Sequence, residues 1–237
     1  MPGRPWVMTQ TWHDLLFAHW PIDAHVLRSK IPPGFALDLF DGVAWIGVVP
    51  FRMSNVGPRG APPLPWVSAF AELNVRTYVQ VDDKPGVYFF SLDASSAMAV
   101  WTARALFNLP YYRASMALTR RGTQIEYESR RGRDGHAAEL VATYGPVGTA
   151  FHPIPGSLEY FLTERYCLYN RDRGGAPYRL EIHHPPWTLQ PAHATLTRNS
   201  MADASGLALP SESPVLHFVE RQDVVAWMPA ALRPSTA

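Results

Sequence analysis

Residues 91–114 read SLDASSAMAVWTARALFNLPYYRA, and this stretch separates two groups of predicted strands. Its apolar side chains fall near helical spacing between residues 95 and 108, which predicts an amphipathic helix. One strand is expected to end at Asp93, just before the helix, and another to begin near Tyr112. Because a strand, a helix and a strand in this order occur in several fold classes, the flanking segments decide among them.

The segments on both sides of this helix are runs of strands joined by turns. Asp41-Gly42, residues 82–86 and Arg121-Gly122 favour tight turns between strands. Strands in runs favour an antiparallel sheet or barrel over alternating strand–helix units. The predicted strands cover residues 15–20, 35–40, 43–51, 69–81, 87–92, 112–119, 124–129, 137–144 and 178–184, with one or two more within 215–227.

Few other helices are predicted, so the fold class is mainly β (α+β). Asp23 is a candidate N-cap for a short helix over residues 24–28. Ser157 is a candidate N-cap for a longer helix over residues 158–168. The remaining predictions are a surface loop and a helical turn, at residues 55–65 and 201–204.

The composition indicates a single folded domain over residues 1–237, since no repeat or linker interrupts the chain. A hydrophobic fraction of 47% is enough for a full core, and a net charge of +1 gives no reason to expect nucleic acid or an anionic membrane as partner. Cys167 is the only cysteine, which excludes an intrachain disulfide and a cysteine-based zinc cluster. With no membrane-length apolar run and no signal-peptide pattern, we expect a cytoplasmic protein.

Several strings of the chain carry a family resemblance. They are WHDLLFAHW (12–20), IPPG (31–34), GVVPFR (47–52), ELNVRTY (72–78), LPYY (109–112), FLTERY (161–166) and EIHHPPW (181–187). Together they resemble the bacterial YqjF-like family, a domain of unknown function, over about residues 7–227. That family is more distantly similar to acetoacetate decarboxylases. The resemblance implies an antiparallel, cone-shaped β-barrel with about three flanking helices and a pocket inside it.

The resemblance also points to missing chemistry. In acetoacetate decarboxylases the helix leads into Gly-Phe-Pro-Lys-Lys, whose first lysine forms a Schiff base, and the two lysine positions here read Tyr111 and Tyr112. Tyrosine cannot form an imine, which requires a neutral amine. Lys84 lies in an Asp-rich turn where we expect it to be solvated, and Lys30 lies beside a Pro-Pro break. Lysine-dependent decarboxylation is therefore predicted to be absent, and whether the chain is an enzyme stays open.

A polar stripe marks the predicted strand at residues 69–81. Glu72, Asn74, Arg76 and Tyr78 alternate along it and face the same side. The stripe is either the solvated outside of the barrel or the lining of a ligand pocket. In the second case Arg76 suits a carboxylate and Glu72 supplies an acid. The distant kinship agrees with this, because the matching decarboxylase glutamate points into the active site.

Other candidates have weaker support. If residues 111 and 112 are extended, only one of Tyr111 and Tyr112 faces the barrel interior, and both residues are otherwise packing aromatics. Arg165, placed on the predicted helix 158–168, is a candidate for closing the pocket at the barrel mouth. His183 and His184 point to opposite faces of a strand, so no metal site is predicted. No glycine-rich nucleotide motif is present, and no cofactor is predicted.

Two functions follow from these residues. The first is a small-molecule pocket protein that binds or transforms a small organic acid or carbonyl compound. The alternative is a non-catalytic structural module, such as a homo-oligomer packed through its eight tryptophans and ten tyrosines. The candidate ligand-binding residues are Glu72, Asn74, Arg76, Tyr111, Tyr112 and Arg165.

Overall fold

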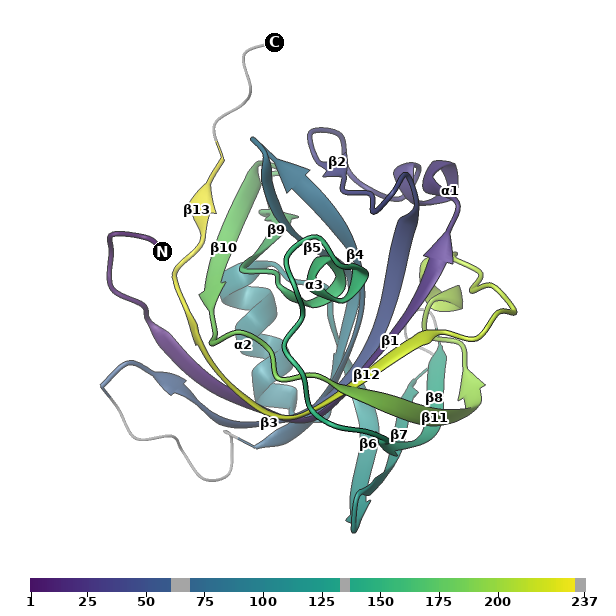
Figure 1. Cartoon of the computed structure of the whole chain (residues 1–237). Helices are drawn as coiled ribbons and strands as arrows, with labels where there is room; N and C mark the ends of the chain where they lie inside the picture. Colours follow the sequence, from purple (N-terminus) through teal and green to yellow (C-terminus); the bar gives the residue numbers. More distant parts are fainter. Residues whose placement is uncertain (61–68, 133–136, 233–237) are drawn as a thin grey trace.

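The computed structural model describes residues 1–60, 69–132 and 137–232, and its strands form one continuous sheet that curves round on itself (Figure 1). Within these residues the strands are β1 (Met8–Ile22), β2 (Ala36–Leu37), β3 (Ala44–Pro58), β4 (Phe70–Val81), β5 (Lys84–Ala94), β6 (Tyr111–Arg121), β7 (Gln124–Arg131), β8 (Ala138–Pro146), β9 (Cys167–Arg171), β10 (Pro177–His183), β11 (Gln190–Asn199), β12 (Val215–Ala226) and β13 (Ala230–Ala231). The helices are α1 (Ala24–Arg28), α2 (Ala97–Phe107) and α3 (Leu158–Thr163), with a 3-10 turn, η1, at Asp203–Ser205.

The sheet closes twice around a shared wall. Strands β12, β1, β3, β4 and β5 pair in that order and form the wall. Strands β9 and β10 connect the two edges of the wall into a smaller ring, and β6, β7, β8 and β11 connect them into a nine-stranded barrel. The predicted antiparallel barrel is confirmed, except that β5 runs parallel to both β6 and β9.

Strand β4 of the shared wall is buried on both faces. On β4, Leu73 and Val75 pack with Tyr127 and Tyr144 in the core enclosed by the nine-stranded barrel. The alternate residues of β4 face the smaller ring, which encloses a second core. A strand in this position has no solvated side, so its polar residues are enclosed as well.

Local sequence sets the element ends as predicted at several points. Asp23 accepts a hydrogen bond from the backbone of His25 at the start of α1, and Ser157 caps α3 in the same way. At Asp41-Gly42 both residues have positive φ, and Phe40 bonds Val43 across the turn. These capped ends fix where α1 and α3 begin.

The structure corrects several other predictions. Helix α3, predicted over residues 158–168, ends at Thr163, and β9 follows it. Strand β3 continues to Pro58 through the predicted loop, whose residues 61–65 lie outside the described part of the chain. Strand β2 pairs with β4 instead of forming a hairpin with β3. Strand β11 was not predicted, and the helical turn of residues 201–204 is centred slightly later, on η1.

Among the described residues, no helix has both the length and the apolar character to span a membrane. The described tryptophans are mostly buried or half-buried in the cores, and Trp101 on α2 is the exposed one. The described tryptophans therefore pack mainly inside the fold.

Candidate functional site

The smaller ring encloses a cavity of about 510 Å³. Its wall consists of side chains from β1, β3, β4, β5, β9 and β10, and α2 contributes residues at one side. Most of these side chains are apolar, including Leu15, Phe17, Val49, Leu92 and Leu180. Volume and character are those of small-molecule sites, which are apolar with a few placed polar groups.

The polar stripe of β4 lines this cavity. Glu72, Asn74 and Arg76 contribute to its wall and are at most 9% exposed. Tyr78 continues the stripe beyond the cavity, where its hydroxyl donates to the backbone oxygen of Leu162 (2.7 Å) and bonds His19 Nε2 (2.7 Å). Glu72, Asn74 and Arg76 therefore line a pocket and do not form a solvated outer face of the barrel.

Glu72 and Tyr111 form a buried pair in the cavity wall. The Tyr111 hydroxyl donates to Glu72 Oε2 over 2.9 Å. Burial raises the pKa of Glu72 to about 8; the hydrogen bond from Tyr111 opposes this rise, and the negative charge of Asp93 adds to it. Glu72 is therefore mainly a neutral carboxylic acid at pH 7, able to donate a hydrogen bond into the cavity.

Arg76 is a buried cation without a carboxylate partner in the described part of the chain. Its Nη2 donates to the backbone oxygen of Leu162 (3.1 Å), and its guanidinium lies 5.2 Å from the ring centre of Phe17. Its Nε and the neighbouring Asn74 Oδ1 are buried and have no hydrogen-bond partner among the described residues. Such groups are costly to bury unless a ligand satisfies them.

Arg165 also lines the cavity, but its charge is already balanced. Its Nη1 lies 2.5 Å from Asp38 Oδ2, and its Nε donates to the backbone oxygen of Phe161. Its guanidinium also lies over the rings of Tyr78 and Phe161. The residue is in the turn after α3, not on the helix as predicted, and its buried side chain forms part of the cavity wall.

Tyr112 is the candidate that lies away from the cavity. Strand alternation turns it outward, and the Arg131 guanidinium lies 4.0 Å from its ring centre. Arg131 in turn forms a buried ion pair with Asp93. Tyr112 and Lys30 line a separate depression on the surface. The structure thus brings together five of the six candidates and leaves Tyr112 outside.

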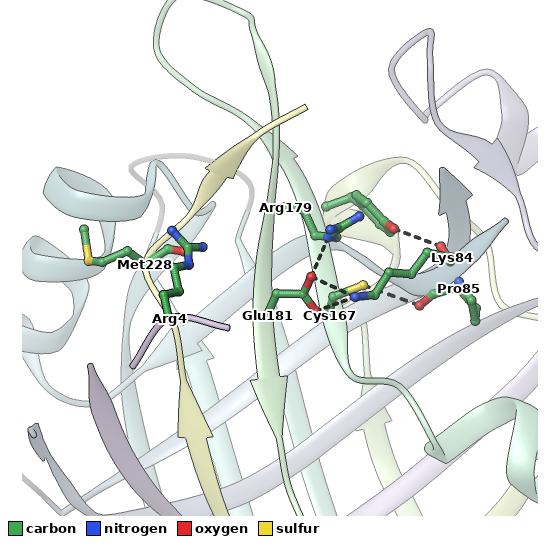
Figure 2. A network of polar contacts seen from close by, with 8 residues as sticks. Arg4, Lys84, Pro85, Cys167, Arg179, Glu181 and Met228 are labelled. Carbon is green, nitrogen blue, oxygen red and sulfur yellow. Dashed lines mark hydrogen bonds and ion pairs between the residues drawn. The ribbon is translucent and has the colours of Figure 1, made fainter. Parts of the chain in front are cut away.

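Both lysines of the chain lie outside the cavity wall. Lys84 was expected to be solvated, but its Nζ is bound by both oxygens of Glu181 at 2.7 and 2.6 Å, and Arg179 bonds the same carboxylate (Figure 2). Its side chain is 39% exposed. The carboxylate of Glu181 therefore holds the Lys84 amine outside the cavity, away from any carbonyl compound bound inside it.

Sequence reasoning missed several lining residues. His184 lies in the cavity wall, stacked on Tyr166 with ring centres 4.6 Å apart, and burial lowers its pKa. Trp12 and Trp187 stack on each other and also line the cavity. Strand alternation placed either His183 or His184 inside, but nothing in the sequence chose between them. The described residues contain no group of three or more His, Cys, Asp or Glu side chains arranged to hold a metal ion.

Comparison of the sequence with known proteins shows which family this chain belongs to. The model of DUF2071, described as an uncharacterized conserved protein, matches residues 9–223. The chain belongs to the DUF2071 family. The uncharacterized protein YqjF of Bacillus subtilis (strain 168) is 46% identical over 227 residues, which are 96% of this chain and 93% of that one. The resemblance read from the sequence is confirmed.

Solved structures extend the likeness at the level of fold. The acetoacetate decarboxylase of Legionella pneumophila has a TM-score of 0.65 at 14% identity, covering 100% of this chain and 94% of that one. The enduracididine biosynthesis enzyme MppR, with HEPES buffer bound, has a TM-score of 0.66 at 10% identity over 97% and 89% of the two chains. An acetoacetate decarboxylase-like enzyme from Sphingomonas wittichii RW1 has a TM-score of 0.64 at 11% identity over 97% and 94%. The acetoacetate decarboxylase-like fold is thereby shown.

Proposed function

We propose that this protein binds a small organic acid in the cavity, with the acid group at Arg76. The observation that carries the proposal is a buried guanidinium that faces an apolar cavity and has no carboxylate partner in the described part of the chain. An isolated buried charge costs several kcal/mol, and a carboxylate ligand offsets that cost by pairing with it bidentately. Arg165 is a weaker anchor because Asp38 already pairs with it.

Other polar groups favour an acid that also carries a carbonyl oxygen. Neutral Glu72 donates a hydrogen bond to such an oxygen, and Tyr111 holds the glutamate in place. The same pair supplies a proton donor if the bound compound is transformed. An imine has no place in this proposal, because Lys30 and Lys84 lie elsewhere.

Calorimetric titration tests the proposal with hexanoate and, as the neutral compound of equal size, hexanamide. We expect hexanoate to bind the wild type and Arg76→Met to weaken it at least about tenfold, the loss of one charge-assisted pair. Arg76→Lys keeps the charge without the planar fork and should give an intermediate affinity. Arg113→Gln removes an exposed arginine on β6 and is the matched control, expected to bind like the wild type.

Two results would contradict the proposal. One is equal affinity for hexanoate and hexanamide. The other is hexanoate binding unchanged in Arg76→Met. Folding of that variant is not at risk from a lost backbone contact, because Tyr78 still donates to the Leu162 oxygen that Arg76 releases.

A further inference from the structure

The cavity has one closed, polar end and one open, apolar end. Asn74, Arg76 and Arg165 are buried at the closed end, behind the turn that follows α3. Met98 and Met228 line the same cavity and are nevertheless 56% and 46% exposed. Residues that face both the cavity and the solvent mark its mouth.

The wall between these ends is almost continuously apolar. On β4 the lining runs from Phe70 near the mouth to Arg76 at the closed end, about 20 Å along the strand at a rise of about 3.3 Å per residue. Apart from the stripe and a few polar residues such as Gln10 and Thr102, the side chains along the way are aliphatic or aromatic. They include Leu15, Phe17, Phe51, Val87, Leu92 and Leu180.

The mouth has a fixed backbone and adaptable side chains. Backbone hydrogen bonds join Val7 to Ala226 and Arg59 to Val7, each over 2.8 Å. The Arg4 guanidinium donates to the backbone oxygen of Met228 (Figure 2). Methionine side chains are unbranched and flexible, so they suit an opening through which apolar groups of varied shape pass.

We infer that the ligand is an amphipathic carboxylic acid whose extended apolar tail runs from Arg76 to the mouth at Met98 and Met228. The inference rests on the proposed function for its acid group and adds the class of its tail. A very short acid would satisfy Arg76 and leave most of the apolar wall in contact with water. A tail removes that wall from water, which tightens binding about fourfold per methylene, equivalent to about 0.8 kcal/mol.

The test measures dissociation constants of butanoate, octanoate and dodecanoate by the quenching of the cavity tryptophans Trp12 and Trp187. Met98→Asp puts a charge at the mouth, and Trp101→Asp puts the same charge on the exposed outer side of α2 as the matched control. Both variants are expected to fold. Ser96 still caps the helix, and an acidic residue at position 98 lies in the first turn, where it favours the helix dipole. Trp101 is 71% exposed, so its replacement leaves no buried gap.

We expect affinity for the wild type to rise about fourfold per methylene over the shorter acids. Met98→Asp should weaken dodecanoate about tenfold or more, because its tail then meets a charge, and should leave butanoate nearly unchanged. Trp101→Asp should bind all three acids like the wild type. Affinity independent of chain length, or a Met98→Asp variant that binds dodecanoate like the wild type, would overturn the inference.

The two proposals fail in different ways. If all three acids depend on Arg76 but not on chain length, the tail is refuted and the acid site stands. If affinity rises with chain length but 1-dodecanol binds as well as dodecanoate and Arg76→Met has no effect, the acid site is refuted and the inferred acid with it. Binding of dodecanoate that is lost in Arg76→Met and in Met98→Asp supports both.

Discussion

The ionisation of Glu72 is coupled to the fold, because the folded chain buries its carboxyl group. This residue lies in the cavity wall, where Tyr111 donates to it, and the negative charge of Asp93, which is not a lining residue, also acts on it. Burial disfavours the carboxylate, so the folded protein keeps the proton up to a pKa of about 8, against an ordinary value of 4.5. Between these two pH values the unfolded chain releases a proton that the folded chain retains.

This coupling predicts how stability depends on pH. Because the folded state binds the extra proton, the free energy of unfolding contributed by Glu72 falls as pH rises from 4.5 to about 8 and is constant above that window. The full shift of pKa corresponds to a loss on the order of 5 kcal/mol at most. Glu72→Gln stays neutral and still accepts the bond from Tyr111, so its stability should lack this fall.

Urea unfolding at pH 5, 6.5 and 8 measures the effect as the difference between wild type and variant. The wild type should lose stability relative to Glu72→Gln at each step. Glu128→Gln removes an exposed carboxylate on β7 and should follow the wild type. Parallel curves for the wild type and Glu72→Gln would mean that Glu72 is ionised in the folded protein at all three pH values.

For single residues, the sequence predicted which side chains of β4 share a face, but not what that face contacts. Alternation placed Glu72, Asn74 and Arg76 on one face from the sequence alone. Whether that face met solvent or a cavity depended on β9 and β10, which cross over it from a distant part of the chain. No local property of the strand carries that information.

The elements show where local signals suffice and where they fail. The caps of α1 and α3 were predictable, because Asp23 and Ser157 act on backbone groups within three residues of themselves. The end of α3 was not, because its C-cap residue Glu164 accepts a bond from the backbone of Trp187, 23 positions along the chain (2.9 Å). Strand β11 was missed for a related reason: its small, polar residues form a strand through pairing with β8.

The junction of β5 with β9 closes the ring around the cavity, and Gly86 sets how closely the two strands approach. A β-carbon on Gly86 would lie 2.8 Å from the backbone oxygen of Cys167 and 2.7 Å from the ring of Tyr169. Gly86→Ala should therefore push β9 outward and lower the free energy of unfolding by about 1–3 kcal/mol, as overpacking does.

Chemical denaturation checks this, with Gly132→Ala as the control because a β-carbon there meets no atom of the described residues within 4 Å. The control should stay within about 0.5 kcal/mol of the wild type. A Gly86→Ala variant as stable as the wild type would show that the junction yields without cost. Weakened hexanoate binding in the same variant would link the ring to the cavity shape.

For the molecule as a whole, the barrel fold can be present without the lysine that Schiff-base chemistry requires. Solved decarboxylase-like structures at 10–14% identity share the barrel over nearly the whole chain. That likeness concerns strand order and closure, which depend on the burial pattern of many residues. A Schiff base depends on one amine inside the cavity, and here Tyr111 occupies the wall beside Glu72 while Lys84 is paired with Glu181.

Borohydride trapping with pyruvate or acetoacetate therefore separates fold from chemistry. In the wild type we expect mass spectrometry to find no reduced adduct, because the Lys84 amine is bound by Glu181 and both lysines lie outside the cavity wall. Tyr111→Lys combined with Glu72→Gln introduces an amine into the cavity and removes the carboxylate that would pair with it. Burial then favours the neutral, nucleophilic form, so this double variant is expected to gain an adduct at position 111. An adduct on Lys30 or Lys84 of the wild type would contradict the expectation, since imine chemistry would then be available outside the cavity. Trapping only in the variant would mean that the cavity still accepts keto acids. The wild type would then fail to form an imine because position 111 holds a tyrosine and not a lysine.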